Sequence, residues 1–267
     1  MSYSRILYTV IDGVAVITLN DPPANTYSYE MMREIDQAVL DARMDNAVHV
    51  VVLTGMGEKF FCAGANIGML KDADPTFKYY FCLHANETLV RLEQTPKLVI
   101  AALNGHTVGG GLEVAMAADI RIARQGGGKI GMPEVALGVL PGTGGTQRFA
   151  RLVGKARAIE LMATGALTSF EEAAAIGLVN QVWGEPELNG RPFAEAVLDY
   201  ARRFTPPHRA SRAVGHIKRA VQSGLEMSLG DGLALERELQ QRLFESDDAQ
   251  EGIRANLEKR QPVFKGA

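Results

Sequence analysis

The chain has 267 residues, of which 46% are hydrophobic and 22% charged, with a formal net charge of −3 and a pI near 6.0. A chain of this length can bury a large core, either as one domain or as a domain with a smaller extension. The acidic balance gives no general attraction to nucleic acid or to an anionic membrane surface. The sequence opens without a charged-then-apolar leader and contains no run of 18 apolar residues, so we expect no membrane association and a cytoplasmic protein.

Motifs for metals and nucleotides are missing from the sequence. The two cysteines, Cys62 and Cys82, lie in apolar or mixed segments without the spacing of metal ligands, so we expect reduced, buried thiols and no metal site. The glycines of Gly142-Thr-Gly-Gly145 are not spaced as in the dinucleotide-binding fingerprint.

The N-terminal segment predicts a β-hairpin followed by a helix. Two β-rich runs, residues 6–11 and 14–19, are joined by Asp12-Gly13, which is a strong short hairpin signal. Ser28 is a suitable N-cap for an amphipathic helix over about residues 29–44.

The middle of the chain predicts an α/β core. Residues 49–54 and 97–103 are short, continuous apolar runs, which is typical of strands buried on both faces. A helical stretch over about residues 76–94 separates them. Strand, helix and strand with short connections form the βαβ arrangement of an α/β core.

The pattern changes after about residue 190. Residues 193–260 contain helical patterns and no strand runs, so we expect a core over residues 1–190 and an all-helical region over residues 191–267. Apolar residues continue to Val263-Phe264, which indicates that this end docks on another surface.

Two further polar patterns predict structural roles. Thr168 and Glu171 have the spacing of a capping box and predict the start of a short helix. Asp119 lies at the end of an apolar helical run, where we expect a structural ion pair with Arg121 or Arg148.

Two glutamates carry the strongest chemical signal. Glu113 ends the glycine-rich run of residues 104–113 and opens an apolar helix, so backbone N–H groups, the positive end of a helix dipole and a carboxylate lie within one turn. Glu134 lies between Met132-Pro133 and the apolar, glycine-rich residues 135–147. Each glutamate alone is compatible with helix capping or loop structure. Two carboxylates in apolar surroundings indicate acid/base catalysis, because burying an unused carboxylate is costly.

Five sequence blocks together resemble the crotonase superfamily, and enoyl-CoA hydratases in particular, from about Leu7 to Lys265. In family order the blocks are Phe61-Cys-Ala-Gly-Ala-Asn-Ile67, Asn104-Gly-His-Thr-Val-Gly-Gly-Gly-Leu-Glu113, Ala118-Asp-Ile-Arg-Ile122, Pro133-Glu134 and Leu140-Pro-Gly-Thr-Gly-Gly-Thr-Gln-Arg148. The resemblance implies an α/β spiral of repeated ββα units and acyl-CoA thioester substrates. It also implies that the helical C-terminal region assembles homotrimers or hexamers, and no cofactor beyond the coenzyme A of the substrate.

The resemblance also implies roles for individual residues. Glu113 would activate the water that attacks C3 and Glu134 would donate a proton to C2, or the two glutamates would share both roles. The backbone N–H groups of Ala65 and Gly110 would form an oxyanion hole for the thioester oxygen. The residues implied to bind substrate are Ala63, Ile67, Met69, Leu70, Gly109, Pro133, Gly142, Phe264 and Lys265.

The chain departs from the hydratase pattern at residues 64–68. Many relatives read Gly-Ala-Asp-Ile-Lys there, whereas this chain reads Gly-Ala-Asn-Ile-Gly and so lacks an acid and a lysine near the coenzyme A. Other cations must then bind the phosphates, and the candidates are Lys59, Lys71 and Lys265 of the same or a neighbouring subunit.

The acyl pocket is expected to be lined by residues 67–89. This segment includes Met69, Leu70, Phe77, Tyr80 and Phe81, which would form a roomy, aromatic wall. Such a wall is compatible with short, branched, cyclic or aromatic acyl groups and does not choose among them.

Three functions therefore remain open. The first is a 2-enoyl-CoA hydratase that adds water syn across the C2–C3 double bond. The second is another crotonase-fold enzyme, such as an enoyl-CoA isomerase, decarboxylase or hydrolase; an isomerase needs only one base, so two retained acids argue against it. The third is a non-catalytic scaffold or RNA-binding relative, against which the acidic pI and the intact site argue.

Overall fold

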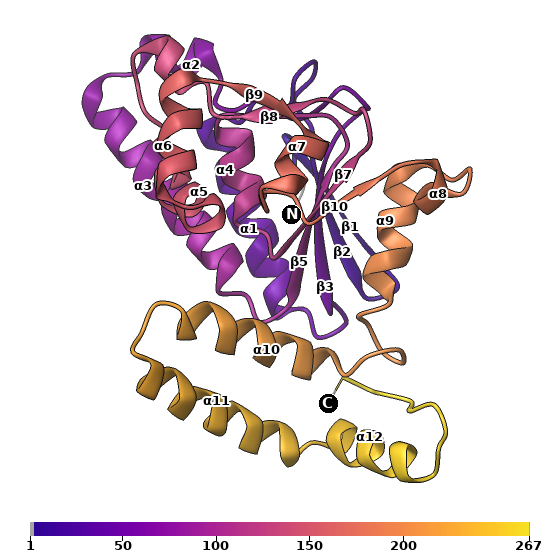
Figure 1. The fold of residues 1–267 in the computed structure, drawn as a ribbon. Coiled ribbons are helices and arrows are strands. Elements are labelled where there is room, and N and C mark those ends of the chain that lie inside the picture. Colours follow the sequence, from indigo (N-terminus) through magenta and orange to yellow (C-terminus); the bar gives the residue numbers. More distant parts are fainter. Residues whose placement is uncertain (1–2, 267) are drawn as a thin grey trace.

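The computed structural model describes residues 3–266 and contains two β-sheets surrounded by helices (Figure 1). The larger sheet has the strand order β1-β2-β3-β5-β7-β10, and the smaller has the order β4-β6-β8-β9. The strands are β1 (Ile6–Ile11), β2 (Val14–Leu19), β3 (Val50–Gly55), β4 (Phe60–Cys62), β5 (Leu98–Leu103), β6 (His106–Val108), β7 (Ile120–Arg124), β8 (Lys129–Gly131), β9 (Leu167–Ser169) and β10 (Gln181–Trp183).

Helices lie between groups of one or two strands, and the last five helices of residues 3–266 follow β10. They are α1 (Tyr29–Met44), α2 (Ile67–Asp72), α3 (Pro75–Glu93), α4 (Gly110–Met116), the 3-10 turn η1 (Glu134–Leu137), α5 (Gly145–Val153), α6 (Lys155–Thr164), α7 (Phe170–Ala175), α8 (Glu185–Leu188), α9 (Phe193–Arg202), α10 (Ser211–Gly224), α11 (Leu229–Phe244) and α12 (Asp247–Leu257).

The chain alternates between the two sheets and so winds as a spiral. β3 and β4 are followed by α2 and α3, β5 and β6 by α4, and β7 and β8 by η1, α5 and α6. Within the larger sheet, β2, β3, β5, β7 and β10 pair in parallel, and only β1 runs antiparallel to its neighbour. This repetition is the ββα spiral that the sequence resemblance implies.

The central strands are buried on both faces, as their continuous apolar sequences predict. Val51 and Leu53 of β3 belong to a core that α1 and α3 cover, whereas Val50 and Val52 belong to a second core with α9. Successive side chains of a strand point to opposite faces, so a strand between two cores must be apolar at every position.

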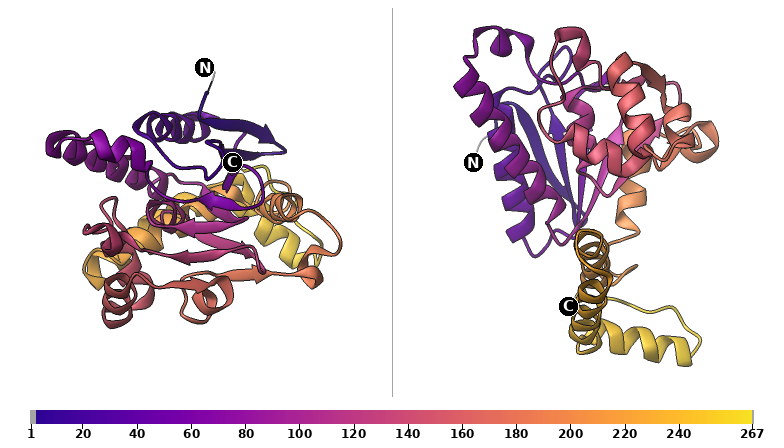
Figure 2. Two further views of the ribbon diagram at one scale, coloured as in Figure 1. Left: turned by 90° about the horizontal axis from the view of Figure 1, so that it is seen from above. Right: turned by 60° about the vertical axis from the view of Figure 1, so that its left-hand side comes forward.

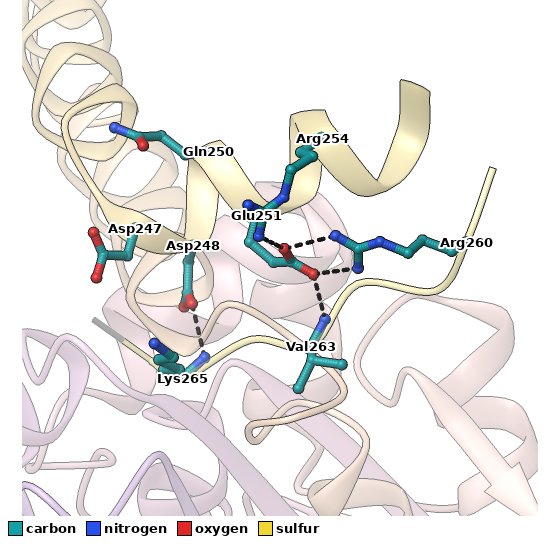
Figure 3. A pocket seen from close by; sticks show the side chains of 8 residues that line it. All are labelled: Asp247, Asp248, Gln250, Glu251, Arg254, Arg260, Val263 and Lys265. Carbon is teal, nitrogen blue, oxygen red and sulfur yellow. Dashed lines mark hydrogen bonds and ion pairs between the residues drawn. The ribbon is translucent and has the colours of Figure 1, made fainter. Parts of the chain in front are cut away.

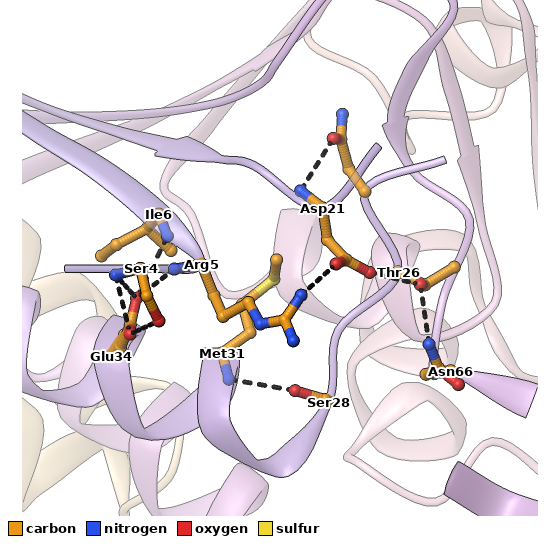
Figure 4. A network of polar contacts seen from close by, with 10 residues as sticks. Ser4, Arg5, Ile6, Asp21, Thr26, Ser28, Met31, Glu34 and Asn66 are labelled. Carbon is orange, nitrogen blue, oxygen red and sulfur yellow. Dashed lines mark hydrogen bonds and ion pairs between the residues drawn. The ribbon is translucent and has the colours of Figure 1, made fainter. Parts of the chain in front are cut away.

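The predicted N-terminal hairpin and helix are present. Asp12 and Gly13 both have positive φ angles of 50° and 81°, as a tight two-residue hairpin turn requires. Ser28 caps α1 by accepting a hydrogen bond from the Met31 amide at 3.3 Å (Figure 4). The Glu34 carboxylate accepts the backbone N–H groups that lead into β1, so α1 is joined to the edge of the sheet.

The capping box lies one residue later than the sequence prediction placed it. Ser169 caps α7 and pairs reciprocally with Glu172. Thr168 lies within β9, where it pairs with Ile130 of β8, and the strand continues to Ser169, so the helix begins only at Phe170.

Helices α10, α11 and α12 form an arm that projects from the core (Figures 1 and 2). α10 and α11 lie side by side, and α10 lies next to the sheet, where it contacts β5. α9 packs on the larger sheet, so the helical pattern begins within the core, and the boundary at residue 190 stays a prediction. Within residues 3–266, no helix combines the length and apolarity needed to cross a membrane.

The predicted partners of Asp119 are wrong. Its carboxylate pairs with Lys218 of α10 at 2.9 Å, and the pair is largely buried. Arg148 pairs instead with Glu93, and the Arg121 side chain donates to backbone carbonyl oxygens. Lys218 is distant in sequence and reaches Asp119 only because α10 docks against the core.

Candidate active site

Both glutamates line one cavity of about 300 Å³ in the core. Its walls come from the loop after β4, from α2, from α3, from the start of α4, and from the stretch between β8 and α5. The predicted site residues that line it are Ala63, Ala65, Ile67, Leu70, Gly109, Gly110, Glu113, Pro133, Glu134 and Gly142. The remaining wall residues are Tyr27, Gly64, Lys78, Val108, Ala136, Leu137, Val139, Leu140 and Thr143.

Glu113 is 2% exposed and is held by the glycine-rich loop before α5. One carboxylate oxygen, Oε1, accepts the amides of Thr143 at 2.8 Å and Gly145 at 2.7 Å. The other oxygen, Oε2, accepts the Thr143 hydroxyl, which in turn lies 3.3 Å from the Tyr27 hydroxyl. A carboxylate offers about four acceptor positions, so these three donors leave room at Oε2 for one further donor, such as a water molecule.

Sequence motifs did not point to Thr143, Tyr27 or Lys78 as site residues. A signal for Thr143 does exist, because a glycine-rich loop that runs into a helix offers unpaired N–H groups to an anion. Here the anion is the carboxylate of Glu113 rather than a phosphate. The loop that follows Glu134 in sequence thus holds the other glutamate.

Glu134 lies in a less polar part of the same cavity. Burial raises the pKa of this carboxyl to about 7, and the negative charge of Glu113 contributes to the increase. A backbone hydrogen bond and the positive charge of Lys78 lower the pKa but do not offset the effect of burial. Its Oε2 is buried and has no hydrogen-bond partner within residues 3–266. Of its apolar sequence neighbours Met132, Val135 and Leu137, only Leu137 lines the cavity. A half-buried carboxyl that keeps its proton near neutral pH can act as an acid.

The loops that carry Ala65 and Gly110 lie directly side by side. A Cβ placed on Gly64 would be 3.1 Å from the Gly110 nitrogen. The Tyr27 backbone pairs with the loop that carries Ala65. The Tyr27 N–H donates to the Gly64 carbonyl at 3.0 Å, and the Tyr27 carbonyl accepts the Asn66 amide at 2.9 Å. In this part of the chain, neither the Ala65 N–H nor the Gly110 N–H has an acceptor among the described residues. Two such neighbouring donors match what an oxyanion hole requires.

Hydrogen bonds of the side chains of Asp21, Thr26 and Asn66 connect the segment after β2 to the loop that carries Ala65. Asp21 accepts the Thr26 hydroxyl at 2.9 Å, and the Asn66 side chain donates to the Thr26 oxygen at 3.4 Å (Figure 4). Asn66 also caps α2 by accepting the Met69 amide. The loop that carries Ala65 is therefore fixed on both sides.

Glycine is required at two positions where the loops approach the site. Gly109 has a φ of 57°, and a Cβ there would lie 2.9 Å from Oε1 of Glu134. A Cβ on Gly110 would overlap the Tyr27 hydroxyl. The glycines thus let the Glu134 carboxyl and the Tyr27 ring pack directly against the backbone that would bind the thioester oxygen.

None of the aromatic residues of the expected acyl wall, Phe77, Tyr80 and Phe81, lines the cavity. Phe81 is buried between Tyr27 and Phe77, with ring centroids 5.8 and 6.2 Å away. Tyr80 is exposed, and Met69 packs against the main core. From residues 67–89, the cavity wall takes only Ile67, Leu70 and Lys78.

Phe264 and Lys265 lie in the arm and do not line this cavity. The Phe264 amide donates to the Pro207 carbonyl at 3.2 Å, and the Lys265 amide donates to Asp248 at 2.7 Å (Figure 3). Lys59 and Lys71 are exposed and also lie outside the cavity wall. Contact of these four residues with substrate stays a prediction.

The arrangement combines a carboxyl that accepts three hydrogen bonds, a carboxyl whose pKa is raised to about 7 by burial, and two backbone donors in neighbouring loops. These groups can take a proton, give a proton and stabilise a negative oxygen. Within the described part of the chain, no group of three or more His, Cys, Asp or Glu side chains could hold a metal ion.

Comparison with known proteins gives the family. The family model for enoyl-CoA hydratase/isomerase matches residues 9–267. The short-chain-enoyl-CoA hydratase of Clostridium acetobutylicum is 38% identical over 97% of each chain, and the crotonyl-CoA hydratase of Syntrophomonas wolfei is 36% identical over 99% of each. A crystal structure of an enoyl-CoA hydratase from Geobacillus kaustophilus HTA426 is 45% identical, with a TM-score of 0.95 over 100% of this chain and 98% of that one. The chain therefore belongs to the enoyl-CoA hydratase/isomerase family, within the crotonase superfamily that its sequence blocks resemble.

Proposed function

We propose that the protein is a 2-enoyl-CoA hydratase that adds water syn across the C2–C3 double bond. Family membership implies an acyl-CoA thioester substrate. The observation that carries the proposal is the division of roles between two carboxyls in one cavity. Glu113 accepts three hydrogen bonds, whereas burial raises the pKa of Glu134 to about 7 and its Oε2 has no partner within residues 3–266.

Hydration needs both of these roles. Attack of water at C3 sends negative charge onto the thioester oxygen, which the N–H groups of Ala65 and Gly110 would stabilise. Glu113 takes a proton from the attacking water, and Glu134 gives its proton to C2. The two new bonds, C3–O and C2–H, form on the face of the double bond that both carboxyls share, so the addition is syn.

We also propose a homotrimer or a hexamer of paired trimers. Support comes from large apolar side chains on the arm, since Leu225, Leu229 and Leu257 are 80%, 79% and 79% exposed in the single chain. Apolar surface of this kind is a common feature of interfaces between subunits. The cytoplasmic location stays a prediction.

Isotope incorporation tests the proposed reaction. Incubation with 2-enoyl-CoA thioesters in ¹⁸O-labelled water should give 3-hydroxyacyl-CoA that carries one labelled oxygen, detected by mass spectrometry. Conversion of a 3-enoyl-CoA to its 2-enoyl isomer without label, together with no hydration of any 2-enoyl-CoA, would identify an isomerase and contradict the proposal. Release of free coenzyme A would identify a hydrolase.

A further inference from the structure

Among the residues that the structure describes, one cationic side chain lines the candidate active site. Lys78 is the only lysine, arginine or histidine among the described residues that form the cavity wall. It lies in the first turn of α3, where Asp74 caps the helix by accepting the Phe77 amide at 2.8 Å. Apolar side chains dominate the wall on the η1 side, with Leu137, Val139 and Leu140.

Lys78 has no acidic ion-pair partner among residues 3–266. No carboxylate oxygen of residues 3–266 lies within 4.0 Å of its ammonium group, and Asp74, one turn earlier, does not pair with it. The ammonium lies over the Phe81 ring, 5.4 Å from the centroid, and Phe81 stacks on Tyr27. The Lys78 ammonium therefore contacts the stacked rings of Phe81 and Tyr27, and Tyr27 packs against Gly110.

Acid catalysis does not account for this lysine. A proton donor at neutral pH needs a raised pKa, and Lys78 lowers the pKa of Glu134. An ammonium group that lies over an aromatic ring and has no ion-pair partner within residues 3–266 gains a strong partner when a carboxylate enters the cavity. Lys78 is therefore better suited to hold a ligand than to assist the proton transfer.

We propose that Lys78 binds a carboxylate at the distal end of the acyl group, so that the preferred substrates are short 2-enoyl-CoA thioesters with a second carboxylate. The inference rests on the proposed hydratase function and deepens it. The double bond is placed between Glu113 and Glu134, and Lys78 lines the same cavity as these two carboxyls. A cavity of about 300 Å³ is at the small end for ligand sites, which favours a short acyl chain.

A matched pair of substrates tests this inference. We would measure kcat/KM for 4-carboxybut-2-enoyl-CoA and for 2-hexenoyl-CoA, which replaces the carboxyl by an ethyl group. The variants are Lys78→Met, which keeps the length of the side chain, Lys78→Arg, which keeps the charge, and Lys155→Met, an exposed lysine outside the cavity, as control.

The parent should prefer the acidic thioester, and Lys78→Met should lower the ratio of acidic to neutral kcat/KM by about 10- to 100-fold, the size of a charge-assisted hydrogen bond. Lys78→Arg should keep most of the ratio, and Lys155→Met should keep all of it. Circular dichroism and gel filtration would first establish that each variant folds like the parent.

An unchanged ratio in a folded Lys78→Met variant would overturn the inference. An equal loss for both substrates would also overturn it, because it would place Lys78 on the coenzyme A, which both substrates share. If 2-hexenoyl-CoA gains water and the acidic thioester does not, the proposed function stands and the inference falls. If neither gains water, the proposed function itself fails.

Discussion

Replacing Glu113 with glutamine is expected to lower kcat for hydration by about 10³-fold while the protein remains folded. The glutamine oxygen can still accept the amides of Thr143 and Gly145, and its NH₂ group can donate to the Thr143 hydroxyl oxygen. The packing is thus largely conserved. The amide cannot take a proton from water, so the loss reports on proton transfer.

Steady-state kinetics with the best 2-enoyl-CoA would measure this loss. Thermal unfolding and gel filtration serve as controls, because a buried side chain with three hydrogen bonds also affects stability. A folded variant that hydrates at the parental rate would exclude Glu113 as the base.

Replacing Glu134 with glutamine should also cost about 10³-fold and should in addition change the pH profile. Burial, chiefly, raises the pKa of Glu134 to about 7, so the carboxyl is protonated below that pH and ionised above it. A proton donor is active in its protonated form. The parental kcat/KM for hydration should therefore fall about tenfold per pH unit above a pH near 7, and the residual activity of the variant should lack this decline.

The pH profile separates a catalytic role from a structural one. A glutamine that merely disturbed the cavity would lower the whole curve and leave its shape intact. Retention of the high-pH decline in the variant would therefore assign the titration to another group and remove Glu134 from the proton-donor role.

Local patterns in the sequence were sufficient for the elements that they determine. The Asp12-Gly13 turn, the Ser28 cap and the apolar strands of the core all depend on neighbours within a few residues, and the structure has them at the predicted places. The Thr168 capping box was wrong by one residue, because the strand that pairs with β8 continues to Ser169 and the helix begins only at Phe170. Tertiary pairing there overrides local spacing.

Contacts between distant segments could not be predicted from local patterns. Thr143 holds Glu113 across 30 positions of sequence, and Lys218 reaches Asp119 only after α10 docks. Lys78 has no motif of its own and is notable only because the fold places it in the cavity wall without an acidic partner in the described chain. The two glutamates were predicted from their apolar, glycine-rich surroundings, whereas their separate roles came from the resemblance of the ordered blocks, since neither glutamate is distinctive alone.

The double variant Glu113→Gln/Glu134→Gln tests most directly whether two glutamates act as one unit. The measurement is kcat/KM for hydration in the parent, in both single variants and in the double variant, each shown to be folded. If both carboxyls act on one water and one double bond, the double variant should lose little beyond the worse single variant, because residues that act together are not additive. Fully additive losses, or one single variant that hydrates at the parental rate, would contradict the two-glutamate mechanism.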